Sequence, residues 1–441
     1  MKINKLYKQL TLANFIHWAA MRFLRVAKII TGYMITIAIN LNPRREVFQK
    51  NLDSLKLNRF YFFRKVKLPY YSVQEGCKKL GAKIVFYKEG EVINLTLPEV
   101  INDDFRVNEA YACRAKLPDV YLAEISDAQI LASTDLIIVG KTILYDQINK
   151  DFFDRYPIKS PLISSVSRDN ITVKWPLKSA SIEQGIHLPK DHTKNYFHWL
   201  IENLPRLSLI SELDKNIPLL VDGDLPEQFY DALAILNQHN REIIKLKNST
   251  IYKVGKLYYP SQLSIFHDSY NNPFYGKDAL YSAKAISYVR DAVLKKIGSH
   301  SSSKRRRKLY ISRKNSDYRQ LLNSDEIEDA LVTRGFEIIF PEHLSFFTQV
   351  QLFSEAEMII GQSGAGMASF IFAPKDCKIL MMMGDFSQSN LHIFGALAQS
   401  MGLNLKYILG KYLTIKKSYI NHSDFYVDVS ILIKYLEEDT K

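Results

Sequence analysis

The chain has 441 residues, enough for two or three domains at about 100–200 residues per domain. Apolar residues make up 47% of it and charged residues 24%, a globular composition that excludes a disordered chain, a collagen and a coiled coil. Its three cysteines, Cys77, Cys113 and Cys377, are far apart and form no CxxC pair, which excludes a disulfide framework or a zinc ribbon and favours a reducing compartment.

The net charge of +13 is concentrated at the N-terminus. Residues 1–68 hold 14 Lys and Arg against two acidic residues, a net +12, so the rest of the chain is nearly neutral. This distribution argues against a protein-wide nucleic-acid surface, and no RNA- or DNA-binding motif is present. A nucleic-acid-binding function is therefore the least supported function for this chain, and nucleic acid is not an expected partner.

Residues 1–68 are predicted to form a basic N-terminal helical arm. Apolar side chains recur in it at the three- and four-residue spacing of a helix with one apolar face: Phe15, Ala19, Phe23, Val26, Ile30, Tyr33 and Ile37. The apolar run at 29–41 is shorter than the roughly 20 residues that span a bilayer, and no signal-peptide cleavage pattern follows it. Such a helix fits an anionic membrane surface, with a helix packed on the globular body or a short signal anchor as alternatives.

Residues 69–297 are predicted to form a first domain of mixed strands and helices. Strands are expected at 83–87, 135–139, 171–174, 217–221, 242–246 and 256–259, and helices at 195–213, 227–237 and 278–297. The segment 298–308 is rich in Ser and then basic, which predicts a linker.

Residues 298–441 are predicted to form a second domain in which strands and helices alternate. We expect strands at 309–313, 336–340, 358–361, 378–383 and 405–409, helices at 345–356 and 388–401, and a helix after Asn323 with Glu326 completing a capping box. The alternation predicts a parallel sheet covered on both faces, an α/β fold whose ligands bind at the carboxyl ends of the strands.

The segment around His198 holds the first candidate site. On a helix, His198 and Glu202 share a face, and Asn195 lies near that face at the helix start. A carboxylate beside an imidazole can act as a general-base pair. The alternative is a hydrogen-bonded core histidine and a solvated glutamate.

A glycine-rich turn after a predicted strand holds the second candidate, Gly361-Gln-Ser-Gly364-Ala-Gly366-Met367-Ala-Ser369. Glycines there let the backbone approach a ligand and point its amides at an anion, although a plain tight turn is the alternative. The third candidate is Ser312-Arg313 at the end of another strand, followed by Arg319. Arg313 can bind a phosphate with two hydrogen bonds, or it is an ordinary surface arginine.

Other kinds of site are poorly supported. The histidines form no HxxxH, no GxSxG elbow is present, and only Asp222 and Asp224 leave room for a metal. No metal is therefore expected.

The motifs and their order along the chain resemble the sequence pattern of glycosyltransferase family 61, which includes many bacterial capsule and lipopolysaccharide enzymes. The resemblance covers roughly 191–383 and two of its positions depart from the family pattern: Ser363 stands where the family has His, and Ser369 where it has Asn. The matching residues are Asn195, His198, Glu202, Pro205 and Arg206, then Tyr310–Arg313, Gly335 and Phe336, then Ser345, Phe346, Gln349 and Val350, and finally Gly361–Ser369.

The resemblance implies a GT-B architecture, two Rossmann-like domains facing across a cleft. It implies inverting, metal-independent transfer from a nucleotide-sugar donor, usually UDP-linked, to a hydroxyl of a glycan or lipid-linked glycan acceptor. With the basic arm, this places the protein in the cytoplasm, peripheral at the inner face of the cell membrane. No separate cofactor is expected.

Each candidate residue then has an expected role. Glu202 is the expected general base, with His198 orienting it or the acceptor, and Glu342 or Glu326 is expected to hold the ribose. The donor site is expected to be formed by Arg313, Ser312, Arg319, Ser363, Gly364, Ala365, Gly366, Met367, Glu342 and Asn195. The alternatives are a non-catalytic glycan-assembly scaffold that kept the fold, which Ser363 brings into question, and another sugar-nucleotide enzyme such as an epimerase.

Removal of residues 1–50 is predicted to release the protein from liposomes that contain anionic lipid, because most of the positive charge and the apolar helix face are lost with them. Liposome co-sedimentation of the full chain and the shortened chain measures this. Equal binding of the two would reject the membrane role of the arm.

Overall fold

The computed structural model describes residues 64–96, 99–102, 112–146, 160, 162–176, 178–266, 278–298, 306–385, 391–414 and 422–438. The amphipathic helix predicted at 15–37 lies outside these residues. Of the predicted arm, 64–68 are described, and they form the first part of strand β1 (Arg64–Tyr71). Among the described helices, none has the length and the apolar character needed to cross a membrane.

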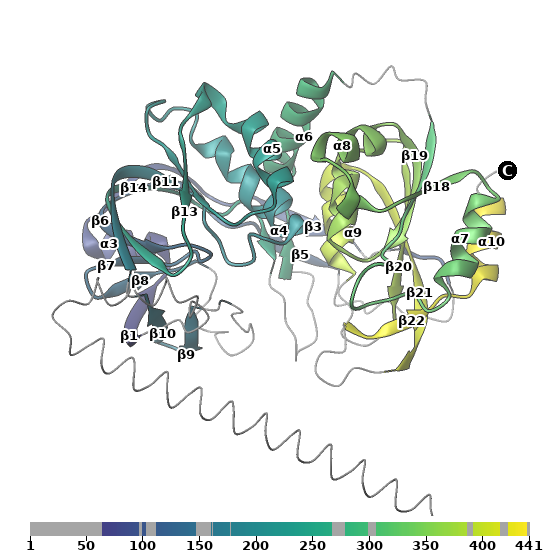
Figure 1. The fold of residues 1–441 in the computed structure, drawn as a ribbon, viewed down its shortest axis with the longest axis horizontal. Coiled ribbons are helices and arrows are strands. Elements are labelled where there is room, and N and C mark those ends of the chain that lie inside the picture. The colour runs from purple at the N-terminus through teal and green to yellow at the C-terminus, as the bar shows by residue number, and fades with distance from the viewer. Residues whose placement is uncertain are drawn as a thin grey trace, which may run out of the picture.

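The N-terminal part of the described chain is built on a mixed sheet (Figure 1). Strands β13, β12, β11 and β14 are mutually parallel neighbours, whereas β6 runs antiparallel to β14. The order in space is β13 (Ile243–Leu246), β12 (Leu219–Asp222), β11 (Lys178–His187), β14 (Thr250–Pro260), β6 (Val120–Leu131), β7 (Ile137–Val139), β8 (Thr142–Leu144), β1, β10 (Asn170–Trp175) and β9 (Ile163–Val166), with β2 (Lys83–Lys88) beside β6.

The C-terminal part is built on a second sheet, which is parallel except for its last strand. Its order is β18 (Phe336–Ile339), β17 (Arg307–Ile311), β19 (Ala356–Gln362), β20 (Lys378–Gly384), β21 (Asn404–Thr414) and β22 (Asp424–Tyr426). The predicted strand–helix alternation is thus confirmed here, and the chain has an α/β fold. The mixed N-terminal sheet departs from a purely Rossmann-like expectation.

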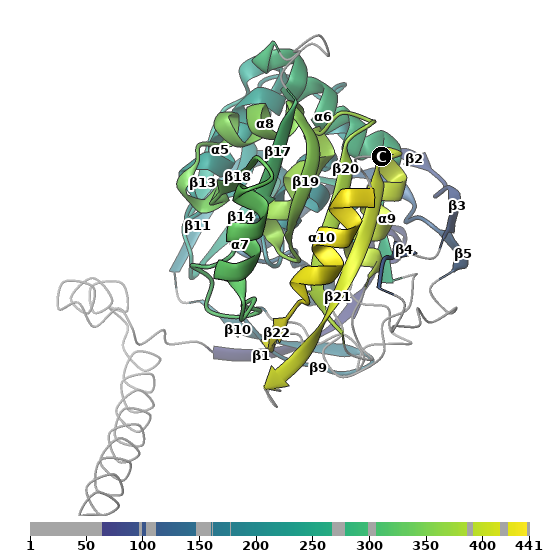
Figure 2. The same cartoon turned by 90° about the vertical axis from the view of Figure 1, so that its right-hand side faces the viewer.

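Alternate side chains of the C-terminal strands enter two different cores, as a parallel sheet buried on both faces requires. In β19, for example, Ile359 packs on the side facing the N-terminal part, whereas Met358 and Ile360 pack on the outer side. The outer side is covered by α7 (Ser324–Val332) and α10 (Val429–Glu438), as Figure 2 shows. The inner side is covered by α8 (Phe346–Ser354), α9 (His392–Met401) and the 3₁₀ helix η8 (Ala365–Phe372).

Helix α6 (Ala283–Ile297) joins the two parts. Its N-terminus is capped by Ser282, which accepts the Ala285 N–H, and it ends at Gly298, whose φ of 71° is the left-handed conformation that favours glycine. The helix contacts α5 (Glu227–Leu236) on one side and α8, α9 and η8 on the other. A single apolar cluster therefore includes side chains of both parts, among them Trp199 and Phe229 from the first and Phe346 and Phe394 from the second.

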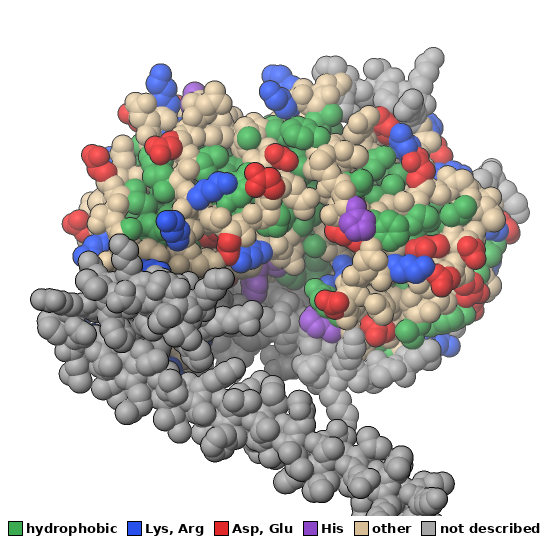
Figure 3. Space-filling model, viewed as in Figure 1, with side chains coloured by type: hydrophobic (Ala, Val, Ile, Leu, Met, Phe, Trp, Pro, Cys, Tyr) green, Lys and Arg blue, Asp and Glu red, His purple; other side chains and the backbone are tan. Residues whose placement is uncertain are grey.

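The surface of this body carries no field of one sign on the face shown in Figure 3, where acidic and basic side chains alternate among apolar ones. This agrees with the nearly neutral charge of the chain after residue 68.

Two further features depart from the predicted ranges. Strand β4 (Glu99–Val100), within the predicted first domain, pairs with β21 of the C-terminal sheet, and the predicted linker 298–308 already contains the start of β17. The predicted capping box is not formed. The Asn323 side chain accepts no hydrogen bond from the N–H groups at the start of α7 and instead donates to the Glu326 side chain and to the Val427 carbonyl oxygen.

The small elements complete the described chain. They are α3 (Val73–Leu80), the hairpin of β3 (Val92–Leu95) and β5 (Cys113–Lys116), the short helix α4 (Tyr196–His198), the π-helical turn η3 (Trp199–Asn203), the 3₁₀ helices η4 (Leu204–Leu209), η5 (Gln238–Asn240) and η7 (Pro341–His343), and the pair β15 (Ile265–Phe266) and β16 (Ala279–Leu280).

Candidate active site

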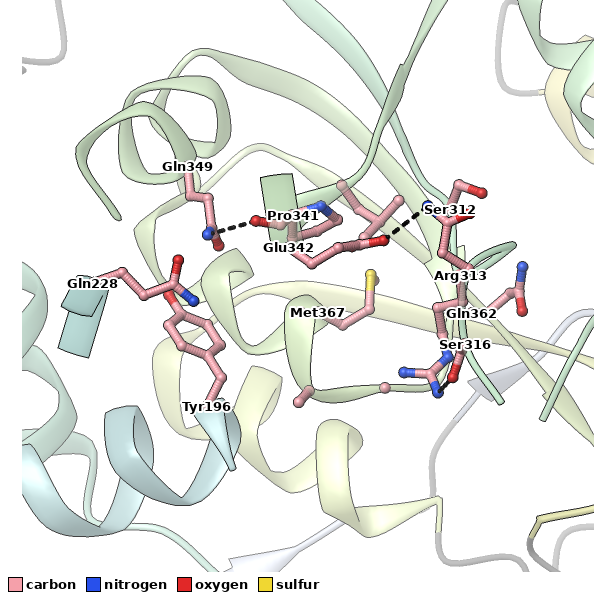
Figure 4. A pocket seen from close by; sticks show the side chains of 15 residues that line it. Tyr196, Gln228, Ser312, Arg313, Ser316, Pro341, Glu342, Gln349, Gln362 and Met367 are labelled. Atoms are coloured by element: carbon pink, nitrogen blue, oxygen red, sulfur yellow. Dashed lines mark hydrogen bonds between the residues drawn. The ribbon is translucent and has the colours of Figure 1, made fainter. Parts of the chain in front are cut away.

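A cavity of about 340 Å³ lies at the carboxyl ends of β17, β18 and β19, where a parallel sheet is expected to bind its ligand. The two parts of the chain both contribute to its walls, since Tyr196 and Gln228 lie on the side opposite Arg313 (Figure 4). The lining residues are Tyr196, Gln228, Ile311, Ser312, Arg313, Asn315, Ser316, Pro341, Glu342, Gln349, Gln362, Gly364, Ala365, Gly366 and Met367.

The Arg313 guanidinium lies directly on the glycine turn. A Cβ atom on Gly364 would come within 1.9 Å of Arg313 Nη1, far inside van der Waals contact. The φ of Gly364 is −179°, extended backbone that any residue adopts, so a side chain here would cause no backbone strain but would displace the Arg313 guanidinium from its place on the turn. The sequence prediction that Arg313 and the glycine turn converge is consistent with this arrangement.

Arg313 lines the cavity, and Arg319 lies beside Arg313 without lining the cavity itself. Among the described residues, no carboxylate lies within ion-pair distance of Arg313 or Arg319, and the buried Nε atom of each has no hydrogen-bond partner. Arg313 donates to Ser316 Oγ at 2.8 Å, and both guanidinium groups lie over the Tyr318 ring. Burial, and then the neighbouring Arg319, lower the pKa of Arg313 to about 10. Two nearby cations with unused donors are suited to an anion such as a diphosphate.

The amide groups of the glycine turn also favour the binding of an anion. Gly364, Ala365 and Gly366 precede or begin η8, whose first N–H groups have no partner within the helix. Such a helix start favours a negative charge. Met367 lines the cavity as well, but its N–H is donated to the Gly364 carbonyl oxygen.

The two serines of the predicted site are used differently. Ser312 lines the cavity, but its hydroxyl donates to Glu328 at 2.8 Å and accepts the Lys314 N–H, so it shapes the turn that carries Arg313. Ser363 is buried and is absent from the residues that line the cavity; its N–H is donated to the Met382 carbonyl oxygen. The serine that stands where the resemblance leads one to expect His is therefore not part of the cavity lining.

Of the remaining residues predicted for the donor site, some line the cavity and others do not. Glu342 lines the cavity and accepts a hydrogen bond from Asn315, whereas Glu326 lies on α7 and accepts from Asn323. Asn195 does not line the cavity: its side chain accepts the Phe197 N–H and caps α4. Of the two ribose candidates, the structure brings only Glu342 to the cavity.

His198 and Glu202 are in contact on one helix face, as their spacing predicted. His198 Nδ1 is hydrogen-bonded to Glu202 Oε2 where α4 passes into the π-helical turn η3. Single π-helical turns of this kind are frequent at functional sites. The His198 side chain is 14% exposed and the Glu202 side chain only 2%, so of the two groups the imidazole is the one that solvent or a substrate can reach.

Glu202 is bound at both of its oxygens. Its Oε1 accepts a hydrogen bond of 2.8 Å from the Lys190 ammonium group, which is itself 3% exposed. Burial by itself would raise the pKa of Glu202, but Lys190 and His198 outweigh it and lower this pKa to about 2. A carboxylate that is so weak a base and has both oxygens occupied is poorly suited to take a proton from an acceptor. The predicted role of Glu202 therefore needs revision.

The contributors that the sequence analysis missed include Lys190, Tyr196 and Gln228. Tyr196 was inside the first motif, but its hydroxyl is hydrogen-bonded at 2.8 Å to Ser369 of η8, a contact between the two parts of the chain. Gln228 is the second residue of α5, and Lys190 lies in a loop after β11. No periodic pattern in the sequence links these positions to the others.

The cavity and the dyad of His198 and Glu202 are adjacent along the chain but are not one pocket. Tyr196 lines the cavity, and His198 follows it two residues later on α4, yet neither His198 nor Glu202 is among the lining residues.

The two possible metal ligands, Asp222 and Asp224, have other partners: Asp222 accepts the Ser133 N–H and Asp224 is paired with Lys194. The described residues contain no group of three or more His, Cys, Asp and Glu side chains arranged to hold a metal ion.

Residues 196–380 match the family model described as Glycosyltransferase 61. The matched segment begins at the start of α4 and ends within β20, so it contains the dyad, Arg313 and the glycine turn. No curated protein sequence matches the chain.

Replacement of Gly364 by Ala is predicted to weaken binding of UDP by roughly 10- to 150-fold. The new Cβ would displace the Arg313 guanidinium, and a hydrogen bond to a charged group is worth about 1.5–3 kcal/mol. Calorimetric titration with UDP measures the effect. Gly366→Ala is the matched comparison. Its Cβ would meet Pro341 at 3.1 Å and Ile311 at 3.9 Å but no arginine, so it should weaken binding less. Unchanged UDP binding by Gly364→Ala would contradict the assignment of this cavity.

Proposed function

We propose that the protein is a glycosyltransferase of family 61, whose family model matches residues 196–380, and that it transfers a sugar with inversion from a nucleotide-sugar donor to a hydroxyl of a bacterial surface glycan. The observation that carries this proposal is the packing of Arg313 on Gly364 in a cavity at the carboxyl ends of parallel strands. The donor is UDP-linked and the acceptor is a capsule or lipopolysaccharide glycan, two points for which the resemblance to family 61 is the support.

The leaving diphosphate is stabilised by protein cations and amides. As the bond between the anomeric carbon and the phosphate oxygen breaks, negative charge develops on the diphosphate. The Arg313 guanidinium, with Arg319 beside it, supplies positive charge there, and the amides at the start of η8 supply donors. Glu342 is placed to accept a hydrogen bond from a ribose hydroxyl. These groups can support the reaction without an essential metal.

His198 is the general base in this proposal, and Glu202 orients it. The Glu202 carboxylate accepts the Nδ1–H of the imidazole, which leaves the lone pair of Nε2 for the proton. The acceptor hydroxyl gives its proton to Nε2 while its oxygen forms a bond to the anomeric carbon on the face opposite the leaving phosphate. These roles are the reverse of those expected from the sequence, because the structure buries Glu202 and leaves His198 partly exposed.

The arrangement of two parts around one cavity also supports the proposed GT-B architecture, with the donor in the C-terminal part and the acceptor against the N-terminal part. Gln228 and Tyr196 are the N-terminal side chains that face the donor cavity. We place the enzyme at the inner face of the cell membrane, for which the basic N-terminal 68 residues are the support.

A panel of UDP-, GDP- and CMP-sugars tests the proposed function directly. We expect UDP-sugars to raise the melting temperature most, and one of them to release UDP when a glycan acceptor is added. The anomeric proton coupling of the product by NMR should show inversion, and EDTA should leave the rate unchanged. Stabilisation by UDP with no turnover of any donor would favour a scaffold, and turnover without an acceptor would favour another sugar-nucleotide enzyme.

His198→Asn and Glu202→Gln are each predicted to lower kcat by roughly 10²–10⁴-fold, the usual contribution of an acid–base group or of the carboxylate that orients it. His239→Asn, at an exposed position with a left-handed backbone that Asn tolerates, is the control and should leave kcat unchanged. Since the pKa of Glu202 is about 2, its carboxylate stays charged at neutral pH and adds no step to the wild-type pH profile there.

The exchange of roles has its own test. His198→Ala should regain part of its activity when free imidazole is added, because the added base can take the proton. Activity of Glu202→Gln should not respond to imidazole. Full turnover in both His198→Asn and Glu202→Gln would reject the dyad.

A further inference from the structure

We propose that Lys190 is a positioning residue for the transfer reaction: its buried ammonium group holds the Glu202 carboxylate charged and oriented so that this carboxylate can orient His198. The inference rests on the proposed function, in which His198 is the base. Lys190 lies outside the motif that contains His198 and Glu202, and outside the matched residues 196–380. It belongs to the loop that follows β11.

The three side chains form one chain of hydrogen bonds with the carboxylate in the middle. Lys190 Nζ donates to Glu202 Oε1 at 2.8 Å, and Glu202 Oε2 is bonded to His198 Nδ1. Exposure rises along this chain, from 2–3% for Glu202 and Lys190 to 14% for His198. The imidazole end thus reaches the surface, whereas the ammonium end is enclosed and cannot touch an acceptor sugar.

The loop that carries Lys190 is held rigidly. The Lys190 N–H is donated to Thr193 Oγ1 at 3.2 Å, and the Thr193 hydroxyl is hydrogen-bonded back to the Lys190 carbonyl oxygen. The next residue, Asp191, accepts a hydrogen bond of 2.5 Å from the buried Tyr145 hydroxyl. Gln262 Oε1 accepts a second, longer hydrogen bond from Nζ, at 3.4 Å. The ammonium group is therefore fixed before any substrate binds, which is what an orienting group requires.

A carboxylate buried to this extent needs a cation to remain charged. The titratable groups that face Glu202 are Lys190 from the loop after β11, His198 from α4 and Tyr281 from the segment before α6. Lys190 is the permanent cation of this set. Without it, burial would raise the pKa of Glu202, and a protonated Glu202 would no longer accept the Nδ1–H. The imidazole would then lose the tautomer that leaves Nε2 able to take a proton.

A purely structural role for Lys190 predicts something different. In that case its removal would lower the thermal stability and the amount of folded enzyme, but the folded fraction would keep the wild-type kcat and pH profile. A positioning role predicts a change in kcat and in the acidic limb of the profile, with the KM for the donor unchanged, because the donor cavity is lined by other residues.

The experiment compares Lys190→Met, Lys190→Arg and the double variant Lys190→Met/Glu202→Gln in the full-length chain, with the active UDP-sugar as donor. Lys194→Met is the matched control: Lys194 is also paired with an acidic residue, Asp224, but 55% of its side chain is exposed. The measurements are kcat, the donor KM, the pH profile of kcat and the melting temperature of each variant.

We expect Lys190→Met to lower kcat by about 10- to 100-fold, the usual effect of removing an outer partner of a functional histidine. Its acidic limb should move to higher pH, because loss of the neighbouring cation makes the Glu202 carboxylate easier to protonate. Lys190→Arg should retain most of the activity, and Lys194→Met all of it. In the double variant, loss of Lys190 should lower kcat no further than Glu202→Gln alone, because Lys190 acts through that carboxylate.

Wild-type kcat and pH profile in folded Lys190→Met would overturn the inference. If that variant does not fold, the double variant decides, since it removes both charges together: a kcat well below that of Glu202→Gln alone would overturn the inference as well. These results are distinct from failure of the proposed function, which would show as full activity in His198→Asn and Glu202→Gln.

Discussion

The site depends on the burial of one aromatic ring, Phe197, between the two parts of the chain. Its ring centroid lies 5.3 Å from that of Phe394 on α9 and 5.6 Å from that of Phe266, and rings at such distances bury a large apolar area. Phe197 stands between Tyr196 and His198 on α4. Once its ring is anchored, Tyr196 is directed to the cavity and Ser369, and His198 to Glu202. One packing contact thus orients both halves of the proposed chemistry.

The two halves treat charge in opposite ways. In the N-terminal part, the carboxylate of Glu202 is enclosed and bonded at both oxygens, so its charge is already balanced before a ligand arrives. In the C-terminal part, Arg313 and Arg319 lie near each other, and among the described residues neither forms an ion pair, although the Glu342 carboxylate of the same cavity acts on Arg313. Neighbouring cations outside ion pairs favour binding of an anion, whereas a balanced dyad favours transfer of a proton. The division fits a reaction that needs both.

The parts that carry these halves are interlocked. Strand β4 extends the C-terminal sheet, and the buried Asn102 side chain bonds both the N–H and the carbonyl oxygen of Leu409 in β21. Gln399 on α9 accepts from the Thr96 N–H and donates to the Asn94 carbonyl oxygen. Together with the shared apolar cluster around α6, these contacts oppose separation of the two parts. The walls of the cavity come from both parts, so these contacts also hold the cavity together.

Local patterns along the chain determined the strands and helices of the C-terminal sheet, the shared face of His198 and Glu202, and the meeting of Arg313 with the glycine turn. The last of these follows because both come after neighbouring parallel strands, whose carboxyl ends meet at one edge. Only the tertiary structure decided that Glu202 is buried against Lys190, that Ser363 does not line the cavity and that Tyr196 reaches Ser369. Burial and pairing depend on residues distant in the chain, and the loop that brings Lys190 to Glu202 has no periodicity by which its path could be predicted.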